Sequence, residues 1–175
     1  DGLFTPGTAM IQPAMYIRGV ADGLRQDGVT IYENSPVTAL NNDGNWVAET
    51  QQGQVSSAHV ILAVNGHLNS FGFAKSRLMH VFTYASMTRA LTPQEIGKLG
   101  GNPVWGLTPA DPVGTTVRRI SGTGGDRLII RNRFTFDPTM EVNPKRIAKI
   151  GRDHDTSFLN RFPDLSNVRM EYNLV

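Results

Sequence analysis

The sequence feature that most constrains the fold is a run of five apolar residues, Val60 to Val64, that leads directly into Asn65-Gly66. A short unbroken run of this kind is typical of a strand that is buried on both faces. Asn-Gly is also a common hairpin turn, but a hairpin needs a partner strand immediately afterwards. Residues 67–77 are irregular. We therefore interpret the run as the end of a central strand, where small residues let the backbone approach a ligand.

The residues before this run predict a helix and strands that would pack with it. A helix is expected over residues 12–28, with Pro13 in its first turn and Gly28 just past its end. Its apolar stripe consists of Ile17, Val20, Ala21 and Leu24. We then expect a strand at 29–32, a hairpin that turns at Asn42-Asp43-Gly44, and a second turn at 51–58. A helix beside strands in this order indicates an α/β layer.

From about Phe71 the pattern is that of an antiparallel sheet with helices. The expected strands are 80–91, 104–109, 114–121, 126–136 and 168–172. A short helix at 93–99 would have Thr92 as its N-cap, and a second would run from Asn143-Pro144 to about Phe162. The second helix has one stripe of Ile147, Ile150, His154 and Phe158. The predicted fold class is therefore α+β (α/β), an α/β lobe followed by a largely antiparallel sheet with covering helices.

Composition excludes several classes of function. The chain has 175 residues, 17 Lys and Arg against 15 Asp and Glu, and a net charge of only +2, which is too small to argue for a nucleic-acid surface. Arg118-Arg119 and residues 131–133 are interpreted as solvated strand residues. There is no cysteine, which excludes disulfides and thiolate chemistry and is consistent with a cytoplasmic protein. No apolar run is long enough to predict a membrane span.

No set of residues in the sequence forms a complete catalytic constellation. The glycine-rich stretch 121–126 is followed by a strand, whereas a phosphate-binding loop must open a helix, so we interpret it as a turn. There is no Gly-x-Ser-x-Gly elbow, and the carboxylates are scattered. The four histidines lack partners at metal-ligand spacing, and we interpret His154 as a core or interface residue. Difficult chemistry would have to come from a cofactor.

Four segments together resemble the flavin-dependent D-amino acid oxidase/glycine oxidase superfamily, and most closely its γ-glutamylputrescine oxidoreductase-like branch. They are "QPAMYIRGVADGLRQDGVTIYENSPVTAL", "GQVSSAHVILAVNG", "HVFTYASMTRAL" and "RFPDLSNVRMEY". The resemblance implies an FAD-dependent enzyme that oxidises the C–N bond of an amine or amino acid, with hydride transfer to the flavin. It also implies a partial FAD-binding domain at 1–70 and a substrate-binding domain at 71–175.

The resemblance implies roles for particular residues. Glu33 and Val37 match the family's E-x-x-x-V segment, in which the valine contacts the adenine of FAD through its backbone. The other implied cofactor residues are Ala63, Val64, Asn65 and Gly66, and the candidate substrate-binding residues are Tyr84, Met87, Arg118 and Arg131. An arginine in this lobe could hold a substrate carboxylate through its bidentate fork. Solvent-facing strand positions remain the alternative for each substrate candidate, and the catalytic residues stay unknown.

Some family features differ in this chain. The N-terminal strand–Gly-x-Gly-x-x-Gly–helix is absent, Thr88-Arg89-Ala90-Leu91 stands where many members have Thr-Glu-Pro-Leu, and "YNLV" stands near the usual Trp-Gly. We expect the chain to be the middle of a longer protein, inactive alone and a poor binder of FAD because the pyrophosphate-binding helix start lies outside it. A non-catalytic binding or assembly module of the same fold is the alternative, and an unrelated α+β domain is a weaker one. Substrate, electron acceptor and oligomeric state are left open.

Overall fold

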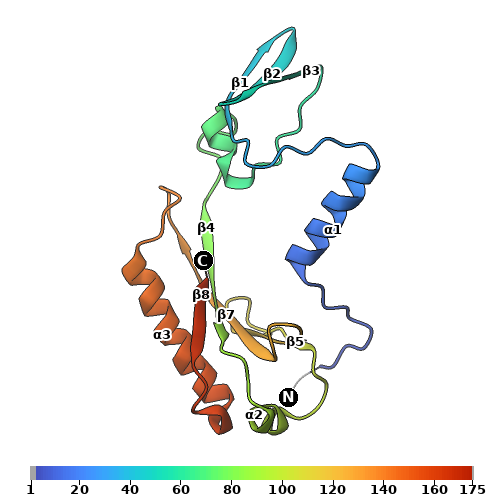
Figure 1. The fold of residues 1–175 in the computed structure, drawn as a ribbon. Coiled ribbons are helices and arrows are strands. Elements are labelled where there is room, and N and C mark those ends of the chain that lie inside the picture. The colour runs from blue at the N-terminus through green and yellow to red at the C-terminus, as the bar shows by residue number, and fades with distance from the viewer. Residues whose placement is uncertain (1–2, 175) are drawn as a thin grey trace. The chain divides into compact units, whose positions relative to one another are not determined.

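The computed structural model describes residues 3–174, which divide into two compact units (Figure 1). One unit is Ile11–Leu78, and the other joins Met79–Val175 to the segment that ends at Met10. The division falls between residues 78 and 79, whereas the sequence places a domain boundary between 70 and 71. The assignment of the two parts to FAD and substrate binding stays a prediction.

The first unit contains a three-stranded antiparallel sheet with strand order β1-β2-β3. Its elements are α1 (Pro13–Gln26), β1 (Val37–Asp43), β2 (Asn45–Thr50), β3 (Gly53–Ser57) and the 3-10 helix η1 (Asn65–Phe71). Asp43 pairs with Asn45 across Gly44, whose φ of +86° suits a residue without a side chain, so the predicted hairpin is confirmed. The predicted turn at 51–58 is wrong in its extent, because the turn itself is residues 51–52 and β3 follows.

Helix α1 is confirmed with both of its predicted ends. Pro13 lies in the first turn, the side chain of Gln12 accepts a hydrogen bond from the amide of Ala14 at 3.0 Å, and Gly28 has a φ of +88°. The apolar stripe is present but uncovered, because none of the helix residues is buried and Ile17 is 63% exposed. The apolar face of α1 is therefore not packed into a core of the described residues.

The predictions of strands at 29–32 and 59–64 are wrong. Both segments have irregular backbone, and Ile61 is 92% exposed. A strand needs a neighbouring strand to pair its backbone amides and carbonyls, and neither segment pairs with a strand of the described chain. The expectation that no hairpin follows Asn65-Gly66 is confirmed, because these residues begin η1 instead.

The second unit is a five-stranded sheet in which every neighbouring pair is antiparallel, with strand order β5-β6-β7-β4-β8. Its strands are β4 (Val81–Thr88), β5 (Trp105–Leu107), β6 (Thr116–Ile120), β7 (Arg127–Phe136) and β8 (Met170–Leu174). Its helices are α2 (Pro93–Leu99), α3 (Pro144–Arg161) and the 3-10 turn η2 (Pro163–Leu165). The mixed α+β fold class predicted from the sequence is confirmed.

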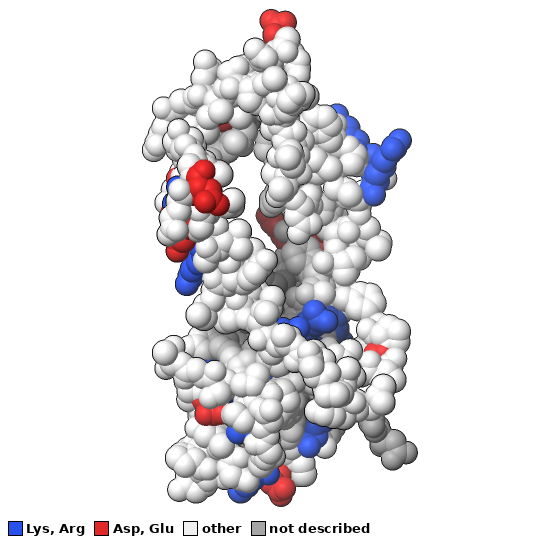
Figure 2. All heavy atoms as spheres, turned by 90° about the vertical axis from the view of Figure 1, so that its right-hand side faces the viewer, with Lys and Arg blue, Asp and Glu red and all other residues white. Residues whose placement is uncertain are grey.

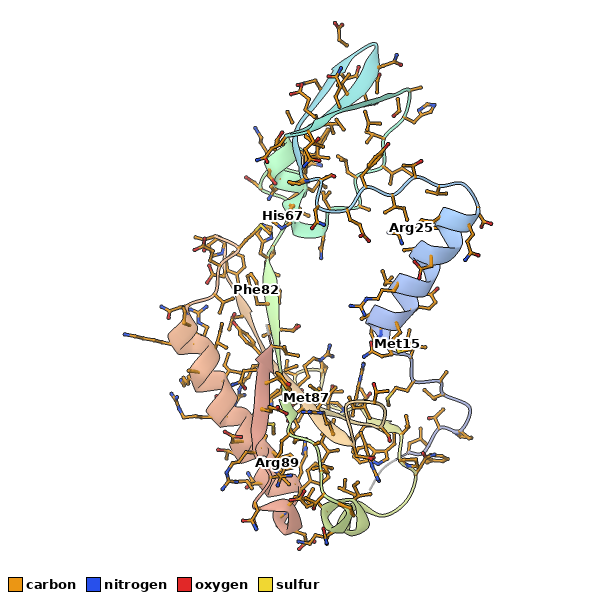
Figure 3. All side chains as sticks on the ribbon, viewed as in Figure 1. Met15, Arg25, His67, Phe82, Met87 and Arg89 are labelled. Carbon is orange, nitrogen blue, oxygen red and sulfur yellow. The ribbon has the colours of Figure 1, made fainter. Side chains whose placement is uncertain are left out.

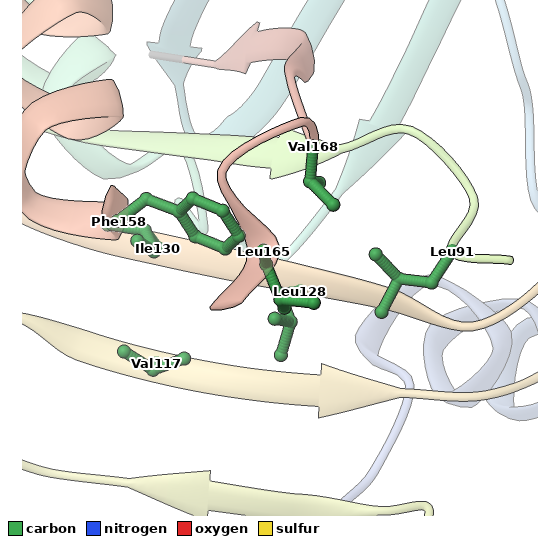
Figure 4. Close-up of a cluster of buried hydrophobic side chains, with 7 residues drawn as sticks. All are labelled: Leu91, Val117, Leu128, Ile130, Phe158, Leu165 and Val168. Atoms are coloured by element: carbon green, nitrogen blue, oxygen red, sulfur yellow. The ribbon is translucent and has the colours of Figure 1, made fainter. Parts of the chain in front are cut away.

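Helix α3 packs against β4, β7 and β8 and covers one face of this sheet (Figure 1). Figure 4 shows the core between them, which consists of Leu91, Val117, Leu128, Ile130, Phe158, Leu165 and Val168. Alternate residues of a strand point to the same face, and this is why Leu128 and Ile130 are both fully buried. The other face of the sheet, opposite α3, carries three of the four candidate substrate residues, Met87, Arg118 and Arg131.

The N-caps of both helices in this unit are confirmed. Thr92 accepts from the amide of Glu95 at 3.3 Å while the Glu95 carboxylate accepts from the amide of Thr92 at 2.8 Å, which is a complete capping box. Asn143 accepts from the amide of Lys145 at 2.9 Å at the start of α3.

The described helices include none that is both long and apolar enough to cross a membrane. Lys and Arg side chains occur in small separate groups on the face shown in Figure 2, among residues that are mostly uncharged.

Candidate functional site

A hollow of about 400 Å³ lies in the first unit, where the start of β1 meets η1. It is lined by Val37, Thr38, Val64, His67, Ser70 and Phe71. Two of the predicted cofactor residues, Val37 and Val64, are thus brought to one hollow although they are far apart in the sequence. The other three, Ala63, Asn65 and Gly66, do not line it. His67, Ser70 and Phe71 were missed because no sequence pattern marks a 3-10 helix after the apolar run.

The backbone at Asn65 builds this hollow. Asn65 has a left-handed φ of +49°, which asparagine tolerates better than most residues, and η1 begins there. The amide of His67 donates to the carbonyl of Val64 at 3.1 Å, and the Ser70 hydroxyl donates to the carbonyl of His67 at 2.6 Å. This tight turn places three side chains of η1 around one space; His67 is labelled in Figure 3.

The lining of the hollow combines three apolar and three polar side chains, with no Lys or Arg among them. Apolar walls with a few hydroxyl and imidazole groups suit a flat, uncharged ring system. A phosphate group would instead need cationic side chains or a helix N-terminus with free amides. The hollow therefore fits the ring part of a nucleotide cofactor better than its phosphates.

The open face of the five-stranded sheet, defined here by Ala85, Met87, Arg118, Ile129 and Arg131, brings three predicted substrate residues together. Ile129 pairs with Met87 on one side and with Arg118 on the other. Arg131 pairs with Ala85 and with Thr116. Directly paired residues share a face, so Met87, Arg118 and Arg131 lie on the same side of the sheet. Figure 3 labels Met87 on β4.

Tyr84 is separated from these three residues. It is 1% exposed, and its hydroxyl lies 2.6 Å from the Oγ1 of Thr135. It pairs with the buried Asn132 and lies on the same side of β4 as Ser86, which contacts α3. The structure thus places Tyr84 on the covered face of the sheet and Met87 on the open face.

Arg118 and Arg119 have opposite environments. Arg118 is exposed, as is Arg131, which agrees with the interpretation of solvated strand residues. That interpretation is wrong for Asn132, which is 8% exposed. It is also wrong for Arg119, which is 2% exposed and donates from Nη1 to the carbonyls of Gly100 and Asn102 at 2.7 and 3.2 Å. Its other terminal nitrogen, Nη2, lies 3.7 Å from Asp126. Arg119 therefore fixes the loop after α2, while Arg118 faces outward.

Tyr172 and Arg127 also belong to the open face, and sequence reasoning missed both. Tyr172 pairs with Met87, and the Arg127 guanidinium lies 5.5 Å from the centre of its ring. Arg127 donates to the carbonyl of Thr88 at 2.8 Å and forms an ion pair with Glu171. Its charge is therefore balanced within the sheet. The sequence predicts strands at 80–91 and 168–172. Recognising that these two strands pair with each other could have placed Tyr172 on the open face.

The interpretation of His154 as a core histidine with satisfied hydrogen bonds is confirmed. It is 1% exposed, with Nδ1 2.7 Å from the Oγ of Ser86 and Nε2 3.3 Å from the carbonyl of Asn132. Burial lowers the pKa of the imidazole, because the charged form would lose its hydration. In the part of the chain that is described, no three His, Asp or Glu side chains gather as a metal site would require.

Two comparisons with known proteins gave matches. The family model described as FAD dependent oxidoreductase (DAO) matches residues 1–173. Dimethylglycine dehydrogenase, mitochondrial, from Rattus norvegicus is 38% identical over 64 residues, which is 35% of this chain and 8% of the rat protein. The match thus spans only a small part of that relative.

Proposed function

The chain belongs to the DAO family of FAD-dependent oxidoreductases, and from this membership we propose that its full-length protein oxidises the C–N bond of an amine or amino acid. When bound, FAD supplies the hydride acceptor for such a reaction. The residues of this chain would bind and orient the substrate and keep water away from it.

The observation that carries the proposal is the placement of Met87, Arg118 and Arg131 on the open face of the sheet. An arginine there can hold a substrate carboxylate by two parallel hydrogen bonds. Met87 and Ile129 offer apolar surface to the carbon chain of the same substrate. Anchoring the carboxylate and covering the carbon chain together would fix which C–H bond faces the acceptor.

We propose that the hollow of Val37, Val64 and Phe71 receives the adenine ring of FAD. Its partly apolar lining, without Lys or Arg, fits that ring, and Thr38 and Ser70 can hydrogen-bond to ring or ribose atoms. The pyrophosphate does not fit this lining, because no cation is among its residues. Residues other than these six would have to hold it.

The substrate class is proposed from the same chemistry. The rat relative is named for dimethylglycine, an N-methylated amino acid with one carboxylate. D-Amino acids, glycine and γ-glutamylputrescine also contain an amine and a carboxylate that an arginine could hold. The γ-glutamylputrescine oxidoreductase-like branch therefore stays part of the proposal, beside N-methylated amino acids.

The test is to purify the full-length protein and record its visible absorbance. The expected result is a flavin spectrum that bleaches anaerobically with at least one of dimethylglycine, glycine, D-amino acids or γ-glutamylputrescine. A colourless protein that FAD does not reconstitute contradicts the proposal. A bound flavin that no amine reduces also contradicts it, and favours a non-catalytic binding module of the same fold.

A further inference from the structure

Two arginines on the open face have no ion-pair partner among the described residues. Arg118 and Arg131 are both exposed, and neither side chain makes a hydrogen bond or salt bridge to another described residue. The other arginines of β6 and β7 are engaged. Arg119 holds loop carbonyls, Arg127 pairs with Glu171, and Arg133 lies 3.8 Å from Asp153. The two arginines of β6 and β7 that have no partner among the described residues therefore both lie on the open face.

The strand register makes these two arginines diagonal neighbours. Arg118 is opposite Ile129, and Arg131, two residues further along β7, is opposite Thr116. Diagonal positions of an antiparallel pair are about 7–8 Å apart, within reach of long side chains. Two like charges on neighbouring side chains repel each other, weakly in water, and an anion between them offsets this repulsion. A ligand with two anionic groups would remove this repulsion at both arginines.

Small residues on neighbouring strands lie beside the two arginines. Arg131 lies next to Ala85 on β4, and Arg118 lies next to Gly106 on β5. The methyl of Met10 approaches the position that a Cβ of Gly106 would occupy, at 3.4 Å, and forms an apolar edge there. Met87 and Ile129 supply further apolar surface. The open face therefore presents two cationic side chains beside mostly apolar ones.

We infer that the substrate of this site carries two carboxylates, one held by Arg118 and the other by Arg131. The chemical class is an amine or amino acid with a second acidic group, such as an N-alkylated or free amino dicarboxylic acid. This inference rests on the proposed function and narrows it. A substrate with a single carboxylate would occupy one arginine and leave the other charge unneutralised.

The test uses the full-length flavoprotein and two small acids as probes, succinate with two carboxylates and propionate with one. Binding is measured by calorimetry and by the shift of the flavin absorbance, and neither readout requires turnover. The variants are R118Q and R131Q. The control is R152Q, which removes an exposed arginine on α3, at the opposite side of the sheet.

The expected result is that succinate binds at least about tenfold more tightly than propionate, because each paired carboxylate adds charge-assisted hydrogen bonds. R118Q and R131Q should each reduce this preference to about twofold or less, while R152Q retains it. Anaerobic flavin reduction should likewise favour N-methylaspartate over N-methylglycine. Unchanged flavin content and circular dichroism would show that the variants fold.

Equal affinity for the two acids overturns the inference, as does a preference that survives R118Q. Reduction of the flavin by N-methylglycine with no gain from a second carboxylate also overturns it, while leaving the proposed function intact. Failure of every amine to reduce the flavin contradicts the proposed function instead, so the two failures are distinguishable.

Discussion

The Nδ1 atom of His154 on α3 lies 2.7 Å from the Oγ of Ser86 on β4, inside the second unit. The other ring nitrogen faces the carbonyl of Asn132 on β7 at 3.3 Å, and a carbonyl can only accept. Through this one side chain, α3 is joined by hydrogen bonds to β4 and β7, the strands whose opposite face carries Met87 and Arg131.

The stability of the protein should decrease as the pH falls below about 6.5, the ordinary pKa of histidine. Burial lowers the pKa of His154 in the folded state, and the nearby Arg133 acts in the same direction. The hydrogen bond to the carbonyl of Asn132 opposes this shift, as do Asp153 and Asp155. Between the lowered pKa and 6.5 the unfolded chain binds the proton more readily, so protonation favours unfolding. We expect urea denaturation to show a lower free energy of unfolding at pH 5.5 than at pH 7.5.

His154→Gln is the variant that isolates this effect, because glutamine can hydrogen-bond but does not titrate. It should flatten the dependence between pH 5.5 and 7.5, whereas replacement of the exposed His59 by Gln should leave it unchanged. An equally steep dependence in His154→Gln would assign the effect to other groups.

Ser86→Ala should lower the free energy of unfolding by about 1–3 kcal/mol, because it leaves buried polar groups without a partner. Ser86 is 0% exposed, and its hydroxyl also lies 2.7 Å from the Oδ1 of Asn173 on β8. The matched control is Ser56→Ala, at an exposed position of β3, which should change stability by about 0.5 kcal/mol or less. Similar effects of both substitutions in chemical denaturation would contradict the prediction.

Local chemistry explains which elements could be predicted from the sequence. The caps at Thr92 and Asn143 and the turn at Gly44 depend on side chains and φ angles within a few residues. Their structures therefore follow from the sequence around them. The strand β3 was missed because "GQVSS" has no apolar alternation, and all five of its residues are exposed.

Burial could not be predicted so well, because it depends on partners distant in the chain. The run at residues 60–64 and the stripe of α1 have the composition of core residues, yet they are largely exposed among the described residues. For Arg118 and Arg119 the alternation of β6 contained a signal. Arg119 has the same parity as the buried Val117, and this places it inside.

Within the candidate site, the sequence could indicate residue types but not which face they occupy. Tyr84 and Met87 lie on the same strand, β4. Only the pairing register and the position of α3 show that Tyr84 is on the covered face and Met87 on the open face. The register also brings Arg118 and Arg131 together from two strands. Neither relationship is contained in a local pattern, because both depend on which strands are neighbours.

Glu95→Gln should destabilise the protein by about 1 kcal/mol at neutral pH. Arg89 holds both oxygens of Glu95 at 2.7 and 2.9 Å. The hydrogen bond from Arg89, followed by that from the Thr92 amide, lowers the pKa of Glu95 to about 2. The exposed Glu141→Gln variant is the control and should have little effect.

The effect of Glu95→Gln should depend on pH in a defined direction. A carboxylate with a lowered folded-state pKa stabilises the protein above the unfolded value of 4.5, and this contribution is lost as the pH falls toward 2. The difference between the variant and the natural protein should therefore shrink over that range. A difference that stays constant from pH 7 to pH 2.5 would show that the charge of Glu95 does not stabilise the capping box.

Asn65→Val should destabilise the first unit by about 1–2 kcal/mol, because a β-branched residue disfavours a left-handed backbone. Asn65 has a φ of +49° and starts the 3-10 helix that carries His67, Ser70 and Phe71 to the hollow. Asn65→Gly keeps this backbone accessible and is the matched control. In the full-length protein, we expect Asn65→Val to weaken FAD binding, measured by flavin fluorescence, and Asn65→Gly to retain it. Equal FAD affinity for both variants would show that the hollow does not contribute to FAD binding, and would contradict the proposal that it receives the adenine ring.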